Sequence, residues 1–392
     1  MSDVQSLLNL SWVLLCAGLV LMMQAGFICL ETGLARAKNS INVAIKRVVD
    51  FCIASIIFWL FGYALMFGTS AWGVLGTDHF LFGESASPQD LAFFLFQLLF
   101  CATATTIISG GVAERMRFHA YLLVSVLISS VIYPVIGHWV WAAGGAGSPA
   151  GFLKSHGFLD FAGSTVVHSM GGWVSLAAIL VVGPRLGRFN PANRIPIHGH
   201  NLPMAALGMF LMWFGWFGFN GGSTYEVNRQ VSVIFVNTAL AGAAGGLGAL
   251  GASWWLLHRA DVPALMNGVL AGLVAITASA NIMTPGRSIL IALLAGILCT
   301  KATQWLERWE IDDVVGAVPV HAFCGAWGTI AVALFGNSQG WATGLERWGQ
   351  LQIQVAGAAI CFLYAFGVAY VLFSLLNKVY PLRVSAEVSF SP

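Results

Sequence analysis

Long apolar stretches separated by short polar segments run along almost the whole chain. A helix needs about 20 mostly apolar residues to cross the roughly 30 Å hydrocarbon core of a bilayer. Eleven stretches approach this length: 7–30, 44–67, 91–110, 120–141, 163–183, 202–220, 231–258, 263–281, 288–304, 314–336 and 350–376. The pattern predicts an all-α integral membrane protein with eleven transmembrane helices, so its two ends should lie on opposite sides of the membrane.

Lysine and arginine indicate which side each loop faces, because cytoplasmic loops of membrane proteins carry an excess of both. With the N-terminus outside, 14 of the 18 basic residues fall on the inner side. The outer side keeps four: Lys154, Arg229, Arg287 and Arg347. We therefore expect an N-out, C-in topology.

Two distant segments share one pattern, DFAGSTVVHSMGGW at 160–173 and DVVGAVPVHAFCGAW at 313–327. Each has an Asp, a Gly three residues later and a His eight residues after the Asp. In the predicted topology the two helices enter from opposite faces, and a rise of 1.5 Å per residue puts each His about 12 Å deep. We therefore expect His168 and His321 to meet near the midplane, between the halves of an inverted repeat. The halves are helices 1–5 and 6–10, with helix 11 added.

Composition agrees with a membrane protein, since 58% of the residues are hydrophobic and only 9% are charged. Soluble proteins carry about a quarter charged residues. We interpret residues 1–392 as a single transmembrane domain. The net charge of +2 gives no indication of a nucleic-acid partner. Glycines around 242–251 and 268–272 predict closely packed helices.

The sequence indicates neither a metal site nor a cofactor. The seven cysteines lack CxxC spacing and are interpreted as packing residues. His168 and His321 alone supply too few ligands for zinc. As a neutral pair they could line a polar track or relay a proton. The alternative is two core histidines with a structural role, but the matched pattern favours function.

Other polar and aromatic residues have two interpretations each. Asp160 and Asp313 are expected to cap the starts of their helices, and Asp160 could also add negative potential to an outer cation site. Two aromatic clusters, 138–141 and 213–219, should lie at the outer helix ends. They could form an interfacial belt, or a tryptophan beside a hydroxyl could bind a small cation. At the inner side we expect ion pairs of Glu31 with Arg36 and of Glu114 with Arg115, and no special role for His198 and His200.

Several longer motifs carry a resemblance: MQAGFICLETGLARAKNSINVAIKRVVDF near the start, GGVAERMRF at 110–118, HNLPMAALG at 200–208, GWFGFNGGS at 215–223 and DDVVGAVPVHAFCGAWG at 312–328. With these motifs the chain resembles the Amt/Rh family of ammonium transporters, and its Amt branch in particular. The resemblance covers essentially every predicted helix.

The resemblance implies a multi-pass protein of the inner cell membrane that transports ammonium or ammonia, is no enzyme and forms a homotrimer with one pore per subunit. It implies a twin-histidine pore pair at His168 and His321. It also implies a phenylalanine gate that deprotonates ammonium, at Phe100 and Phe219. Ammonium recruitment falls to Trp141, Ser223, Phe100 and Asp160.

The end of the chain departs from the family pattern. Amt proteins usually continue into a tail with a GLD…HGE-like motif that takes part in regulation by PII signalling proteins. Here only LRVSAEV, near residue 382, keeps the start of that tail, and the regular tail is absent after about 383. The resemblance therefore does not extend to PII regulation.

A sensor is the competing interpretation. The sequences MQAGF and CLE in the first helix resemble those of a subgroup in which the membrane domain can be fused to a signalling output domain. Such a protein would bind ammonium and signal with little or no transport, and the same pore residues would serve it. A purely structural scaffold would leave two histidines at the midplane unexplained.

Overall fold

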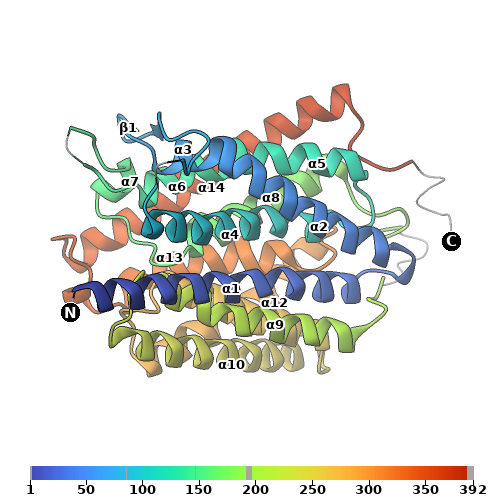
Figure 1. Ribbon diagram of the computed structural model, residues 1–392. Coiled ribbons are helices and arrows are strands. Elements are labelled where there is room, and N and C mark those ends of the chain that lie inside the picture. The colour runs from blue at the N-terminus through green and yellow to red at the C-terminus, as the bar shows by residue number, and fades with distance from the viewer. Residues whose placement is uncertain (1, 85, 146, 191–196, 386–392) are drawn as a thin grey trace.

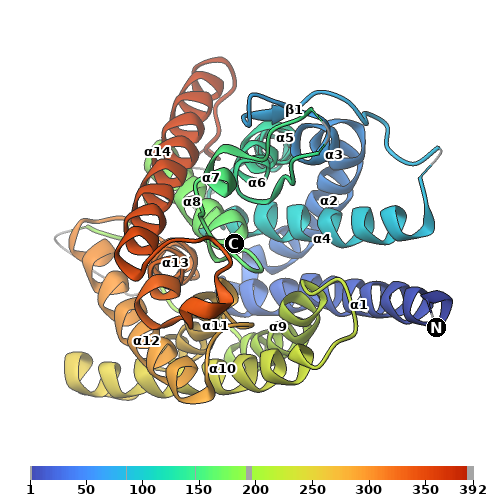
Figure 2. The ribbon, with the colours of Figure 1, turned by 90° about the vertical axis from the view of Figure 1, so that its left-hand side faces the viewer.

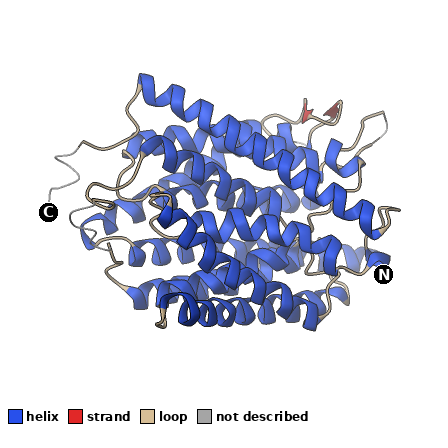
Figure 3. Ribbon diagram, turned by 180° about the vertical axis from the view of Figure 1, so that it is seen from behind, coloured by secondary structure: helices blue, strands red, loops and turns tan. Residues whose placement is uncertain are grey.

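Helices make up nearly all of this protein, whose structure is a computed structural model that describes residues 2–84, 86–145, 147–190 and 197–385 (Figures 1 and 3). In the described part the only sheet is the antiparallel pair β1 (Ser70–Ala71) and β2 (Leu75–Gly76), with Ser70 opposite Gly76. The predicted all-α architecture is confirmed.

The α-helices are α1 (Ser2–Leu34), α2 (Ser40–Ile57), α3 (Tyr63–Phe67), α4 (Pro88–Gly111), α5 (Phe118–Leu127), α6 (Tyr133–Trp141), α7 (Phe152–Ser155), α8 (Met170–Val182), α9 (Leu202–Gly222), α10 (Gln230–Leu257), α11 (Val262–Thr277), α12 (Pro285–Arg308), α13 (Cys324–Phe335) and α14 (Arg347–Val379). Short 3₁₀ helices are η1 (Ala37–Asn39) and η6 (Ser338–Gly340). Four π-helical turns are η2 (Phe58–Gly62), η3 (Ile128–Ile132), η4 (Ser164–Ser169) and η5 (Val318–Phe323).

Among the described residues, ten continuous helical segments are long and apolar enough to cross a membrane. The remaining predicted stretch, 263–281, corresponds to the shorter apolar helix α11 of 16 residues. α1 begins at one end of the bundle and α14 ends at the other (Figure 1), as an odd number of crossings requires. Large apolar side chains such as Leu7, Leu363 and Leu375 lie exposed on the outside of the bundle, where a lipid environment would cover them.

The π-turns were not predicted from the sequence. They widen four of the crossings locally, since η2 joins α2 to α3, η3 joins α5 to α6, η4 precedes α8 and η5 precedes α13. Such turns occur frequently at functional sites. The two that begin the crossings of the repeat, η4 and η5, contain His168 and His321.

Glycines bring the helices close together, as predicted. The first helices of the two halves, α1 and α9, pack along each other. A Cβ on Gly208 would lie 2.5 Å from the carbonyl oxygen of Gly26. In the second half α10 packs on α11 and α12, and a Cβ on Gly245 would clash with the carbonyl oxygen of Gly268.

Two segments of opposite direction lie in the interior. Figure 2 views the bundle along its length, with α8 and α13 surrounded by other helices. The end of α8 meets the start of the η5 crossing, because the backbone N–H of Arg185 donates to Oδ2 of Asp312 at 2.8 Å. The two segments that share the sequence pattern therefore run antiparallel, as an inverted repeat requires.

Some basic residues assigned to inner loops lie inside helices. Lys46 and Arg47 are buried inside α2, and Lys301 lies inside α12. Among the other inner basic residues, Arg194 lies outside the described residues. The imbalance against four outer residues still favours N-out, which stays a prediction.

Candidate functional site

His168 and His321 face each other inside the bundle. Their Nδ1 atoms are 3.2 Å apart and their ring centroids 5.3 Å apart. His168 is fully buried, and 5% of His321 is exposed. One Nδ1 must carry a proton and donate to the other, so two neutral imidazoles can pair in this way only as different tautomers. The repeat thus brings together the two histidines that its pattern singled out.

The spacing that the two repeat segments share has a backbone explanation. Asp160 accepts hydrogen bonds from the N–H groups of Gly163, Ser164, Thr165 and Val166 at 2.8–2.9 Å. Asp313 likewise accepts from the N–H groups at 316, 317 and 318. Each carboxylate satisfies N–H groups that a helix start leaves without partners. Both aspartates therefore act as helix caps.

The glycine three residues after each Asp allows this turn. Gly163 has φ +110° and Gly316 has φ +81°, in the left-handed region that only glycine enters at little cost. The carboxylate can then reach N–H groups as far as six residues ahead for Asp160 and five for Asp313, and the backbone enters a π-turn. The N–H of His168 donates to the carbonyl of Gly163 five residues earlier. The same turn therefore fixes the position of His168 along the helix axis.

A column of aromatic rings continues from His168 toward the other end of the pore. Phe219 lies 5.4 Å from His168 between ring centroids. Phe219 and Phe100 stack face to face at 3.9 Å with an interplanar angle of 6°. Trp141 follows at 6.0 Å from Phe100. Phe100 and Phe219 are both essentially buried, and their stacked rings lie between Trp141 and His168.

Trp216 belongs to the cluster at 213–219, for which an interfacial belt and a cation site were the two alternatives, but it lies in the interior of the bundle. It is fully buried and stacks on His168, with centroids 5.0 Å apart and an angle of 20°. Its Nε1 donates to Oγ1 of Thr277 at 2.8 Å. The sequence signal available was its position three residues before Phe219, which puts both rings on one face of α9. Phe214 on the same helix is exposed, so the cluster splits between two faces.

The residues expected to recruit a cation lie near one another but differ in exposure. Trp141 is partly buried, and its Nε1 donates to the carbonyl oxygen of Asp160 at 2.7 Å. The Ser223 hydroxyl donates to the carbonyl of Phe219 at 2.9 Å. A cavity of about 550 Å³ is lined by Trp141 and Asp160 together with Lys154, but not by Ser223.

The Asp160 carboxylate is directed into the backbone of η4. Because its four bonds go to N–H groups, the carboxylate itself is not free to bind a cation directly. Burial raises the pKa of Asp160, and the four N–H donors oppose that shift. The neighbouring His138 is a core histidine: it lies 2.8 Å from Ser70 Oγ and 2.9 Å from the carbonyl of Met66.

Beside His321 lies a narrow cavity of about 10 Å³, close to the space one water-sized molecule needs. Its lining includes His321, Phe27, Asn267, Val320 and Glu31. Asn267 Nδ2 donates to the carbonyl of Val315 at 3.0 Å, which holds α11 against the start of the η5 crossing.

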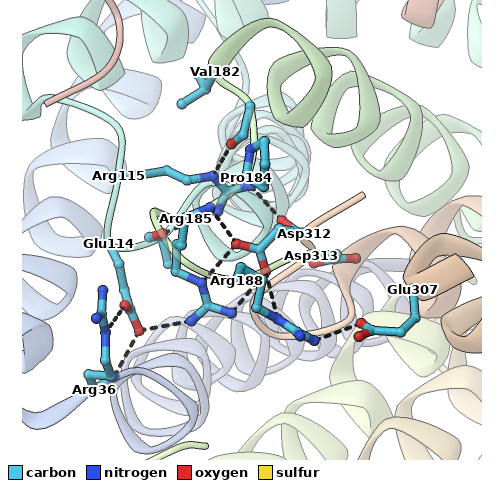
Figure 4. A network of polar contacts seen from close by, with 12 residues as sticks. Arg36, Glu114, Arg115, Val182, Pro184, Arg185, Arg188, Glu307, Asp312 and Asp313 are labelled. Atoms are coloured by element: carbon cyan, nitrogen blue, oxygen red, sulfur yellow. Dashed lines mark hydrogen bonds and ion pairs between the residues drawn. The ribbon is translucent and has the colours of Figure 1, made fainter. Parts of the chain in front are cut away.

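Ion pairs join the two halves at the end of the bundle where α1, α4, α8 and α12 end (Figure 4). Arg185 binds both carboxylate oxygens of Asp312, at 2.9 Å each, and reaches Glu114 at 3.2 Å. Glu114 also pairs with Arg36. Arg188 pairs with Glu307 at 2.6 Å. The network therefore connects the loop after α1, the end of α4, the end of α8 and the end of α12.

Two ion pairs were expected here, Glu31 with Arg36 and Glu114 with Arg115, and both predictions are wrong. Glu31 pairs with Arg47, and Arg36 pairs with Glu114. Arg115 instead donates to the carbonyl oxygens of Gly183 and Asp312. Sequence proximity suggested the pairs, but the helix ends that meet in space decide them.

The network sets the protonation of Asp312. Burial by itself would raise the pKa of Asp312, but the hydrogen bonds and charge of Arg185, with the charge of Arg115, lower it overall. Burial likewise opposes the charged form of Arg185, whereas Asp312 and Glu114 raise its pKa overall.

Within the described residues, no three His, Cys, Asp or Glu side chains gather as a metal site would require. His200 Nδ1 lies 2.9 Å from the carbonyl of Ala35, which gives this member of the His-x-His pair a structural contact between the α1 end and the loop before α9.

Comparison with known proteins agrees with this architecture. The model of the Ammonium Transporter Family matches residues 11–390. The chain is 45% identical over 392 residues to the ammonium transporter Amt2 of Archaeoglobus fulgidus, covering 96% of this chain and 84% of that protein. A solved structure described as a sensor Amt protein is 40% identical with a TM-score of 0.95, covering 99% and 98% of the two chains. Mep2 of Saccharomyces cerevisiae is 26% identical with a TM-score of 0.88, covering 97% and 88%. The chain belongs to the ammonium transporter family.

Proposed function

We propose that this protein carries ammonium across the membrane and passes it through the narrow part of the pore as ammonia. The observation that carries the proposal is the unbroken column Phe100, Phe219, His168, His321, with its stacked rings and its 3.2 Å imidazole contact. An unpaired ion entering such a column would lose its hydration without compensation, which costs several kcal/mol or more.

Recruitment is assigned to the outer end. The Trp141 ring face attracts a small cation and the Ser223 hydroxyl can accept a hydrogen bond from it. Phe100 forms the floor of this site. Asp160 holds the Trp141 ring in position, because its carbonyl oxygen accepts the hydrogen bond from Trp141 Nε1. Ammonium gives up its proton near Phe100 and Phe219, which form the gate.

The histidine pair then offers the neutral molecule hydrogen bonds inside an apolar passage. Ammonia can donate to an unprotonated ring nitrogen and accept from a protonated one. Nε2 of His168 is buried and has no hydrogen-bond partner among the described residues, so it is available for this contact. Potassium has no proton to release and is excluded at the same step. The released proton is relayed separately by the imidazoles.

The experiment is ammonium uptake and current in vesicles that contain the purified protein, comparing the natural chain with His168→Ala. We expect loss of selectivity for ammonium over potassium. His119→Ala is the matched control, since His119 is an exposed helical histidine away from the pore, and it should leave selectivity unchanged. Unchanged selectivity in His168→Ala would contradict the role of the pair.

A sensor is the second candidate, favoured by the 0.95 TM-score to the solved sensor Amt protein. In that case ammonium binds the same site and the signal passes to an output domain, with little or no transport. Ammonium steps on supported membranes separate the two, because a transporter gives a sustained current. A coding sequence that continues beyond Pro392 into a kinase or cyclase domain would favour the sensor.

The assembly proposed is a homotrimer in the inner cell membrane, with one pore in each subunit and lipid around the trimer. Residues 1–392 act in it as one transmembrane domain. No enzymatic activity and no PII-type regulator are included in the proposal. Cross-linking and mass measurement in detergent test the trimer.

A further inference from the structure

Three charged side chains are buried together beside the inner half of the pore, and the transport mechanism above uses none of them. Glu31 on α1 and Arg47 and Asp50 on α2 are each at most 2% exposed. Arg47 binds Glu31 with two nitrogens, and its Nε–Oε2 distance is 2.8 Å. Nη1 of Arg47 lies 3.8 Å from Oδ2 of Asp50. One guanidinium is therefore shared by two carboxyl groups.

The carboxyl groups of Glu31 and Asp50 differ in how many of their oxygens have a hydrogen-bond partner. Both Glu31 oxygens contact Arg47, while Nη1 of Arg47 donates to the hydroxyl and the carbonyl of Thr106. Asp50 receives one hydrogen bond at Oδ2, from the Tyr121 hydroxyl at 2.7 Å. Its Oδ1 is buried and has no partner among the described residues. Glu31 is thus fully paired and Asp50 is not.

Charge balance follows from these contacts. With both carboxyl groups ionised the cluster would carry a net charge of −1 on side chains that are each at most 2% exposed. Burying an uncompensated charge is far more costly than keeping one carboxyl group protonated. The adjacent Lys46 does not compensate it, since its Nζ donates to the carbonyl of Met116 at 2.6 Å and contacts neither carboxylate in the described structure. One proton therefore belongs to the cluster, and in this arrangement it resides on Asp50.

The cluster borders the path of the transported molecule. Glu31 and His321 line the same inner cavity. Between them stands Phe27, whose ring centroid is 5.5 Å from the Arg47 guanidinium and 6.5 Å from the His321 ring. The other titratable groups that face the cluster are Tyr121 on α5 and Cys101 on α4. Glu31 is thus the cluster's only member on the lining of that cavity.

We propose that Glu31, Arg47 and Asp50 form a proton-binding site that returns a proton to ammonia after it has passed His321. The inference rests on the proposed transport. Arg47 pairs with whichever carboxyl group is ionised, and the proton is held by the other. When Glu31 holds it, the Glu31 O–H bond breaks and the lone pair of ammonia forms the new N–H bond. Ammonium and a carboxylate result, and the proton is replaced from water at the inner mouth or from the imidazoles.

The first test is infrared spectroscopy of the protein in membranes near neutral pH, which detects the C=O stretch of a protonated carboxyl group and its shift in D₂O. Glu31→Gln and Asp50→Asn each leave one carboxylate for one guanidinium, so each should lose one such band. Arg47→Gln should gain one. No band in the natural protein, or a band that neither carboxyl variant removes, overturns the proposal.

The second test is the ammonium-induced current in reconstituted membranes. General acid–base groups contribute roughly 10²–10⁴-fold, so Glu31→Gln should lower the maximal current by at least about tenfold, with the half-saturating ammonium concentration little changed. Glu307→Gln, which neutralises an exposed inner carboxylate, is the control and should change neither. A full current in Glu31→Gln overturns the proton-return role. If the natural protein gives no current, the transport proposal fails, and the infrared bands still decide whether the cluster holds a proton.

Discussion

Phe100 and Phe219 lie parallel, 3.9 Å apart between ring centroids, although α4 and α9 that carry them belong to opposite halves of the repeat. The next ring along the path is His168, 5.4 Å from Phe219. The contact between two apolar rings is therefore what separates the outer aromatic residue Trp141 from the imidazoles. This relationship, together with the histidine contact, supports several predictions.

Removing one ring of the stack should open the pore to ions. Phe219→Ala deletes the ring that contacts both Phe100 and His168, and we expect measurable potassium flux. A barrier lowered by about 1.4 kcal/mol raises flux about tenfold. Phe210→Ala, an exposed position on the same helix, is the control and should leave potassium excluded. Isotope flux into vesicles measures both, and an equally tight Phe219→Ala pore would contradict a gating role.

The bond between Trp216 and Thr277 should hold His168 in its orientation. Trp216→Phe and Thr277→Val remove the same 2.8 Å hydrogen bond from opposite partners. The bond is buried, so its loss should destabilise the protein by about 1–3 kcal/mol, and both variants should slow ammonium flux to a similar degree. Slower flux in only one of them would show that the bond is not the cause. The nitrogen chemical shifts of His168 provide a direct readout of its tautomer.

Gly163 should tolerate no side chain. Its φ of +110° is strained for other residues, and a Cβ there would lie 2.7 Å from Val167 Cγ2. Gly163→Ala should therefore lower stability by about 1–3 kcal/mol and disturb the turn that carries His168. Gly18→Ala is the matched control, because nothing lies within 4 Å of that position on α1. Thermal unfolding in detergent compares them, and equal melting temperatures would refute the backbone argument.

Stability should fall in acid through Asp312. Its folded pKa is depressed overall by Arg185 and Arg115, so the stabilisation is present above the unfolded pKa of about 3.9 and is lost as the pH falls through the lower folded value. Asp312→Asn should lose about 3–5 kcal/mol at neutral pH, because the buried Arg185 would have to share Glu114 with Arg36 and would lack a carboxylate of its own.

The pH dependence of unfolding provides the control for the ion pair of Asp312 with Arg185. Asp312→Asn should also show a weaker acid dependence of unfolding than the natural chain. Glu307→Gln, whose ion pair with Arg188 is half exposed, should cost about 0–1 kcal/mol. An acid profile of Asp312→Asn that parallels the natural one would mean that other carboxylates govern acid unfolding.

Periodicity and composition alone determined much of this protein. Apolar runs of about 20 residues can satisfy their backbone groups in lipid only as helices, so the long apolar helices could be located from the sequence. The matched spacing Asp, Gly and His in two segments of opposite direction also sufficed to predict that His168 and His321 meet. The reason is local: the carboxylate cap and the glycine turn fix the height of each imidazole.

Contacts between distant segments were decided only by the tertiary structure. The position of Trp216 against His168 depends on how α9 is rotated toward η4, which an apolar sequence does not reveal because all its faces are hydrophobic. Glu31 pairs with Arg47 and Arg36 pairs with Glu114. The partner of each side chain depends on which charged group the packing of the helices places beside it. The charge cluster of Glu31, Arg47 and Asp50 exists only once α1 and α2 are packed, since spacing along the chain does not show that Glu31 and Asp50 lie beside the same guanidinium.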